Sequence, residues 1–131
     1  PNIPKNNIVF NHLSLDFDED LIITEGIFDA IKAGRNSVPI LGSSLKEGSL
    51  LFQEIVNHDT PIYVALDQDA EKKALSLIKR LLKYGIEMHK VDISPFNDVG
   101  EMTREQFLEK KEKAKLLTIE NYLQYKLQNI F

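Results

Sequence analysis

Five acidic side chains stand where this sequence could do metal chemistry, because each follows the end of an apolar run or lies one helical turn beyond it. They are Glu25, Asp29, Asp67, Asp69 and Asp98. Carboxylates a few ångströms apart repel one another by about 1 to 4 kcal/mol per pair, and a cation removes this cost. Oxygen ligands without histidine or cysteine select hard ions. We therefore expect Mg²⁺, for which Mn²⁺ can substitute.

The elements that must position these acids alternate along the chain. Short apolar, β-branched runs predict strands over 21–24, 38–41, 62–66 and 86–93, after weaker alternating stretches at 8–10 and 13–17. Helical spacing of apolar residues, including Ala30 and Ile31, predicts the helices between them. Thr103 and Gln106 form a capping box that begins a fourth helix. This alternation indicates a doubly wound α/β fold: a parallel sheet of about four strands flanked by helices, with a C-terminal helical extension.

In such a fold, ligands bind at the carboxyl ends of the strands, near the point where the strand order reverses. We therefore expect the five acids to meet at one edge of the sheet. Asp16, Asp18 and Asp20 also alternate, but Leu21 and Ile27 occupy the places where a calcium-binding EF-hand loop needs Gly and Glu. This second acidic segment is interpreted as a solvated turn.

The composition of the chain excludes several other classes of protein and of catalytic site. The chain has 131 residues, 16 Lys and Arg against 20 Asp and Glu, and a formal net charge of −4. It therefore lacks the basic excess of a self-sufficient nucleic-acid binder. The absence of cysteine excludes thiolate zinc sites and cysteine nucleophiles. His12, His58 and His89 have no mutual spacing typical of metal ligands, and we assign them no role.

Two motifs resemble the signatures of the Toprim domain, which primases, topoisomerases and some nucleases share. They are residues 23–30 (Ile-Thr-Glu-Gly-Ile-Phe-Asp-Ala) and 65–70 (Ala-Leu-Asp-Gln-Asp-Ala). The resemblance covers roughly residues 20 to 110. Residues 41–45 (Leu-Gly-Ser-Ser-Leu) and 97–102 (Asn-Asp-Val-Gly-Glu-Met) are most similar to segments of phage-type and bacterial DNA primases.

The resemblance implies that Glu25 is a metal ligand or general acid/base and that Asp67 and Asp69 hold Mg²⁺. Asp29 and Asp98 would complete a second metal position. Gly26 would let the turn bring Glu25 close to the metal. These primases often carry a basic residue before the last acid, whereas this chain has Asn97 there.

The function implied is Mg²⁺-dependent nucleotidyl transfer for RNA primer synthesis on a DNA template. A Toprim nuclease is the nearest alternative, and a phospho-receiver-like binding module is more distant. The sequence shows no zinc-binding module and no basic template-holding region, so we expect an incomplete fragment with weak activity of its own. The expected partners are DNA template and ribonucleoside triphosphates, bound through neighbouring domains, and a replicative helicase.

The expected division is an N-terminal segment over 1–20, read as short strands or as the tail of a preceding region, a Toprim catalytic domain over 21–115 and an amphipathic helix over 116–131. The apolar stripe of that helix suits either the core or a docking role, with the core favoured. No run approaches the ~20 apolar residues of a membrane span. We expect a cytoplasmic location, in a bacterium or in the host of a phage.

Overall fold

A computed structural model describes residues 15–40, 48–67 and 70–130 of the chain. The predicted strand at 8–10, the segment 41–45 and Asp69 lie outside these residues. None of the helices among the described residues combines the length and apolar character needed to cross a membrane.

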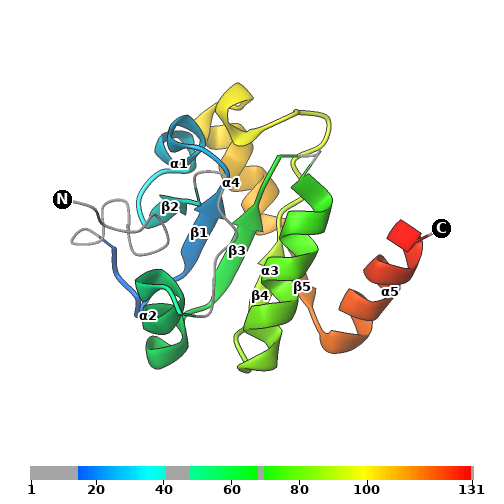
Figure 1. Ribbon diagram of the computed structural model, residues 1–131. Helices are drawn as coiled ribbons and strands as arrows, with labels where there is room; N and C mark the ends of the chain where they lie inside the picture. The colour runs from blue at the N-terminus through cyan, green and yellow to red at the C-terminus, as the bar shows by residue number, and fades with distance from the viewer. Residues whose placement is uncertain (1–14, 41–47, 68–69, 131) are drawn as a thin grey trace.

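A five-stranded sheet forms the centre of the molecule (Figure 1). Its strands are β1 (Leu21–Thr24), β2 (Ser37–Pro39), β3 (Ile62–Ala65), β4 (Met88–Lys90) and β5 (Lys115–Leu117). Their order is β2-β1-β3-β4-β5, with the first four parallel. β2 is an edge strand, where the missing amide hydrogen of Pro39 does no harm.

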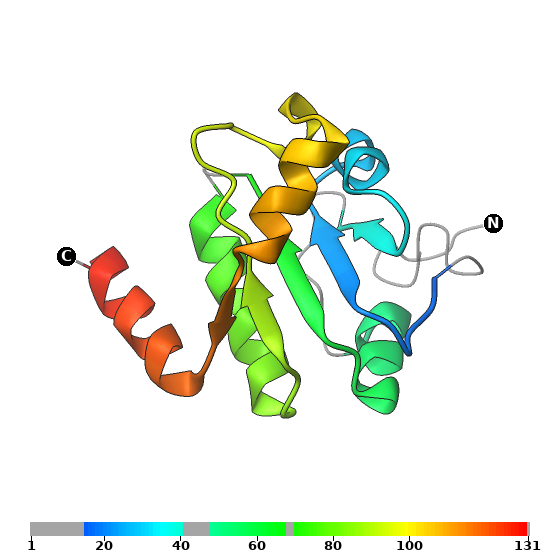
Figure 2. The same ribbon diagram turned by 180° about the vertical axis from the view of Figure 1, so that it is seen from behind.

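Helices cover both faces of the sheet, as Figures 1 and 2 show from opposite sides. The helices are α1 (Ile27–Ala33), α2 (Leu50–His58), α3 (Glu71–Lys83), the 3₁₀ helix η4 (Val99–Glu101), α4 (Arg104–Glu112) and α5 (Ile119–Ile130). Alternate residues of the strands point to opposite faces of the sheet and pack into two separate hydrophobic cores. Ile23 and Val64 pack with α2 and α3, whereas Ile22 and Ala65 pack with α1 and α4. The predicted doubly wound α/β architecture is therefore confirmed.

Local signals fix several helix ends. Thr103 caps α4 by accepting a hydrogen bond from Gln106 N at 3.1 Å, and Gln106 Oε1 accepts one from Thr103 N at 2.9 Å, as predicted. Gly34 ends α1 with φ 97°, and Gly85 follows α3 with φ 77°. Both values lie in the left-handed region that favours glycine.

The C-terminal part differs from the sequence prediction. Residues Lys115–Leu117 form a strand that pairs antiparallel with β4, where we expected the end of the Toprim domain and the beginning of the last helix. A three-residue strand is too short to show a period of two, so pairing with β4 decides its conformation. α5 starts only at Ile119.

One expectation about a helix face and one about a strand are wrong. Tyr122 of α5 is buried, but Ile119, Leu123 and Leu127 are 52% to 64% exposed, so most of the stripe lies outside the core. The described residues of the stretch 13–17 form no strand; they lead into a turn.

Candidate metal centre

The strand order reverses between β1 and β3, because the chain moves from β1 to one side of the sheet and then returns to the other. Residues that follow these two strands enter the same edge of the sheet, where doubly wound folds bind ligands. Glu25 and Asp29 follow β1, and Asp67 follows β3. The expected placement at the carboxyl ends of the strands is confirmed for these acids.

Three of the predicted residues meet at this edge. Asp29, Asp67 and Asp98 each offer a carboxylate oxygen, and the three oxygens lie within 4.8 Å of one another. Asp29 is buried, and the other two are half-buried. We call this trio the carboxylate edge. No second group of this kind occurs among the described residues.

Asp29 is the anchored member of the carboxylate edge. Its Oδ2 accepts a hydrogen bond from Gly26 N at 3.1 Å, and its Oδ1 accepts one from Gly100 N at 2.8 Å. Burial raises the pKa of the Asp29 carboxyl above its usual range, against the effect of these two hydrogen bonds. The charges of Asp98 and Glu25 add to the rise. A bound cation would reverse this balance in favour of the carboxylate.

Gly100 holds the loop after β4 against the carboxylate edge. A Cβ on Gly100 would lie 3.0 Å from Asp29 Oδ1 and 3.1 Å from Asp98 Oδ1, so any side chain would displace both carboxylates. Asp98 is held in place by a contact within its own loop. Its Oδ1 accepts a hydrogen bond from Glu101 N at 3.1 Å and so caps η4. Sequence analysis assigned Gly100 no role, although a glycine two residues after an acid in a loop is a usable signal.

Glu25 lies beside the trio, but it has a partner of its own. Its Oε1 lies 2.8 Å from Lys73 Nζ, which comes from the first turn of α3. Its Oε2 is buried and has no hydrogen-bond partner among the residues that the structure describes. Glu25 and Asp67 therefore share one edge, with an acceptor oxygen of Glu25 still available. Sequence analysis missed Lys73, although a lysine in a first helical turn is unusual.

The conformational reason expected for Gly26 is wrong. Its φ of −124° and ψ of 170° are extended values that any residue adopts. A Cβ would lie 3.5 Å from Asp29 Oδ2, which is an ordinary contact. The contribution that the structure shows is the amide hydrogen that Gly26 donates to Asp29.

A cavity of about 200 Å³ opens beside Asp67, between the ends of β3 and β4. Its lining includes Leu66, Lys90, Asp92 and Ser94. The cavity therefore offers an apolar floor and polar groups of both charges next to a predicted metal ligand.

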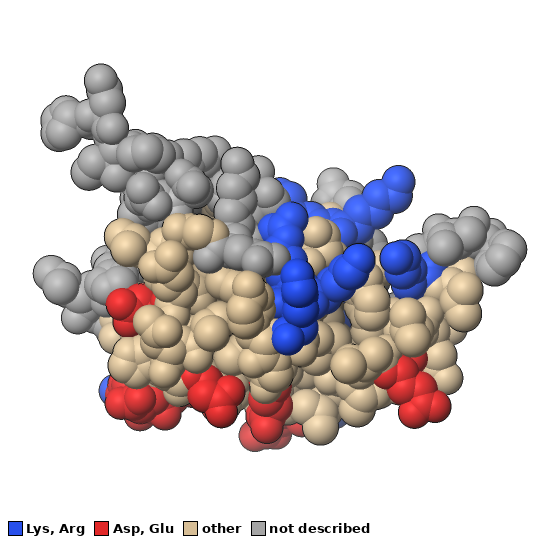
Figure 3. Space-filling view, turned by 60° about the horizontal axis from the view of Figure 1, so that its bottom comes forward, with Lys and Arg blue, Asp and Glu red and all other residues tan. Residues whose placement is uncertain are grey.

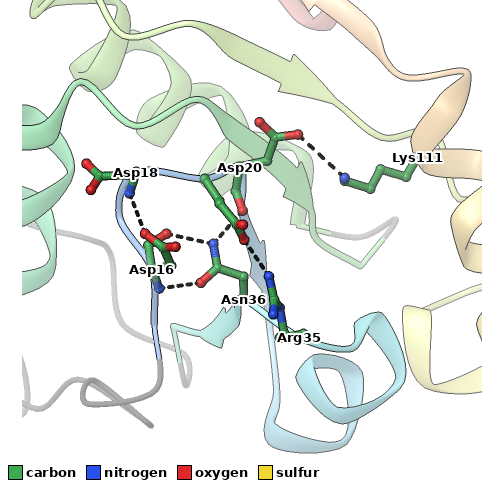
Figure 4. A network of polar contacts seen from close by, with 7 residues as sticks. Asp16, Asp18, Asp20, Arg35, Asn36 and Lys111 are labelled. Atoms are coloured by element: carbon green, nitrogen blue, oxygen red, sulfur yellow. Dashed lines mark hydrogen bonds and ion pairs between the residues drawn. The ribbon is translucent and has the colours of Figure 1, made fainter.

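The second acidic segment has a different character (Figure 4). We call residues 16–20 the acidic turn; it precedes β1 at the other end of the strand. Asp18 Oδ1 lies 3.3 Å from His58 Nδ1, and Asp20 Oδ2 lies 3.7 Å from Lys111 Nζ. Asp16 Oδ1 accepts a hydrogen bond from Asp18 N at 2.9 Å. The interpretation as a solvated turn is confirmed.

The chemistry of the donor set fits a hard divalent cation. Three carboxylates converge, and Glu25 adds a buried oxygen whose hydrogen-bonding capacity is unused among the described residues. Asp29, Asp67 and Asp98 could hold such an ion.

The fold of this chain is similar to that of a solved structure. The crystal structure of a primase from Aquifex aeolicus, with its zinc-binding and RNA polymerase domains, superimposes with a TM-score of 0.66 and 22% sequence identity. The match covers 88% of this chain and 32% of that chain, so the protein corresponds to about a third of its neighbour. No family model and no curated protein match the sequence. The chain thus shares its fold with part of a primase.

Proposed function

We propose that this chain is the Toprim catalytic core of a DNA primase and transfers nucleotides to a growing RNA primer in a Mg²⁺-dependent reaction. The observation that carries the proposal is the convergence of Asp29, Asp67 and Asp98 at the switch point between β1 and β3. The likeness of the fold to part of a primase supports it. The two Toprim-like motifs of the sequence supply the remaining argument.

The roles of the residues follow from their placement. Asp29, Asp67 and Asp98 would hold the ion, and we assign Asp69 to the same set by its place in the motif. When bound, Mg²⁺ supplies the charge that activates a 3′-hydroxyl and neutralises the phosphates of the nucleotide. Glu25 can accept a proton on Oε2 while Lys73 keeps its other oxygen in place.

The cavity beside Asp67 suits part of the incoming ribonucleotide. Its volume of about 200 Å³ is smaller than a whole nucleoside triphosphate needs, so the rest of the nucleotide would extend toward solvent. Ser94 and Lys90 can contact the sugar or phosphate oxygens from the wall of the cavity.

The remaining parts of such an enzyme would lie in neighbouring domains. The chain corresponds to about a third of the primase chain that it resembles. We therefore assign the main contacts with the DNA template to other domains, expect a replicative helicase as partner, and expect weak activity from this chain alone. A cytoplasmic location is part of the same proposal.

A primer-extension experiment tests this function. A labelled RNA primer annealed to a DNA template is incubated with the protein, ribonucleoside triphosphates and Mg²⁺ or Mn²⁺, and binding of Mn²⁺ is measured in parallel by electron paramagnetic resonance. The proposal predicts Mn²⁺ binding and slow extension, and both should disappear in Asp67→Asn. Shortened products would favour the nuclease, and absence of metal binding would contradict both enzymes.

A further inference from the structure

Positive charge is concentrated on α3, although the chain as a whole carries a formal net charge of −4. This helix has one acidic residue and five basic ones, which are Lys72, Lys73, Lys79, Arg80 and Lys83. Figure 3 shows basic side chains gathered across the middle of this view, whereas carboxylates lie along its lower border. The two signs of charge are therefore separated on this side of the molecule.

The spacing of the lysines makes a stripe. Lys72, Lys79 and Lys83 are exposed and are seven and four residues apart, which places them on one face of the helix. The opposite face carries Ile78 and Leu81, both fully buried. At 1.5 Å per residue, the stripe is about 16 Å long.

Helix stability does not explain this stripe fully. Arg80 and Lys83 lie in the last turn, where the helix dipole favours cations. Lys72 lies in the first turn, where the same dipole disfavours them, and Lys79 lies between the ends. Lys73, also in the first turn, is engaged by Glu25. The positive charges of Lys72 and Lys79 are therefore not explained by interaction with the helix dipole.

The stripe fits an extended anion. It is one helix wide, about 10 Å, and carboxylates lie on one side of it (Figure 3). The narrow track suits the phosphates of a single polynucleotide strand better than a wide duplex, whose second strand would approach the carboxylates. α3 starts at Glu71, four residues after Asp67, so one end of the stripe adjoins the carboxylate edge.

We propose that the outward face of α3, through Lys72 and Lys79, binds the phosphate backbone of a single-stranded polynucleotide and leads it to the carboxylate edge. Its role as a track for template or primer rests on the proposed function. The binding itself is an electrostatic property of α3 and needs no metal.

Fluorescence anisotropy of a labelled 20-nucleotide oligo-dT tests the proposal, with the full chain in EDTA and NaCl varied from about 50 to 200 mM. The variant Lys72→Gln/Lys79→Gln removes two charges from the stripe. The control Lys32→Gln/Lys113→Gln removes two exposed charges from α1 and the end of α4, on the other face of the sheet.

We expect the stripe variant to bind roughly fivefold more weakly at low salt than the parent. The slope of log affinity against log salt should become shallower by about 1.4, since each lost contact with a single strand removes about 0.7. The control should retain the slope of the parent, and a duplex of the same length should bind more weakly than the single strand.

Absence of binding by the parent, equal loss in both variants, or tighter binding of duplex would each overturn the proposal. Thermal unfolding shows whether both variants are folded. Mn²⁺ binding separates this inference from the proposed function: the stripe variant should keep the metal site, whereas Asp67→Asn should lose the metal and still bind the oligonucleotide in EDTA.

Discussion

The two ends of β1 carry acidic groups of opposite character. At its amino end, the acidic turn places Asp18 beside His58. It also places Asp20 beside Lys111 (Figure 4). At its carboxyl end, the carboxylate edge brings oxygens of three aspartates within 4.8 Å of one another. Arg35 and Lys111 lie beside acids of the turn, whereas the three aspartates of the edge face one another.

The comparison teaches that the density of acids along a sequence does not identify a metal site. The acidic turn has four acids in five residues, and the carboxylate edge collects one acid from each of three distant segments. The convergence of three carboxylates distinguishes the edge, and a bound ion would relieve their mutual repulsion. The following experiments test this distinction, from the largest expected effect to the smallest.

Substitution at the carboxylate edge should strongly weaken metal binding. Asp67→Asn removes one anionic ligand, and we expect the affinity for Mn²⁺ to fall roughly a hundredfold, or about 2.7 kcal/mol. Asp18→Asn in the acidic turn serves as the control and should leave the affinity unchanged. Isothermal titration calorimetry measures both. An equal loss in the two variants would remove the distinction between the regions.

Substitution of Asn36, which holds the backbone of the acidic turn, should instead reduce stability. Asn36 Nδ2 donates hydrogen bonds to Asp16 O at 2.9 Å and Asp20 O at 2.6 Å, and Oδ1 accepts one from Asp16 N at 2.7 Å. Its φ of 62° also disfavours alanine. Asn36→Ala should lower the free energy of unfolding by about 2 kcal/mol, with or without Mg²⁺.

Chemical denaturation measures this loss, and Asn36→Gly separates its two causes. Glycine tolerates the left-handed backbone but restores no hydrogen bond, so this variant should recover part of the lost stability. If Mg²⁺ rescued Asn36→Ala, the acidic turn would be a metal site after all.

The ion pair of Glu25 gives a sharper test, because it is the point where the carboxylate edge uses a cation of the protein. Lys73→Met leaves Glu25 half-buried without that cation and should cost about 1 to 2 kcal/mol in EDTA. Mg²⁺ should then raise the melting temperature more than in the parent, since Glu25 gains a second source of positive charge.

Lys72→Met, at the adjacent exposed position, is the matched control and should behave as the parent does in thermal unfolding. If Mg²⁺ raised the melting temperature of Lys73→Met and of the parent by the same amount, Glu25 would not interact with the ion.

The smallest effect concerns pH. Because burial raises the pKa of Asp29, the folded state holds this proton more tightly than the unfolded state. The stabilising contribution is present at low pH and declines as pH rises from about 3.8 through the raised pKa. In EDTA, the stability of the parent relative to Asp29→Asn should therefore fall over this range, and Mg²⁺ should reduce the fall. A rise with pH would contradict the raised pKa.

Much of the fold follows from local patterns. The runs around β1 and β3 are apolar and β-branched, and the caps at Gly34 and Thr103 specify where helices end and begin. β5 carries no such signal, because three residues between two helices adopt whichever conformation the free edge of β4 offers. The exposed residues of α5 follow a helical spacing that is the same for core and surface, so the sequence could not place them.

The candidate site shows the same division. Sequence alone determined which carboxylates exist, that they follow strands, and that the strands are parallel, since these depend on residue type and local spacing. Only the tertiary structure decided that Gly100 donates a hydrogen bond to Asp29, that Lys73 pairs with one oxygen of Glu25, and that Lys111 lies beside Asp20. Such pairings join residues far apart in the chain. Their energies depend on distance and burial, which no local pattern encodes.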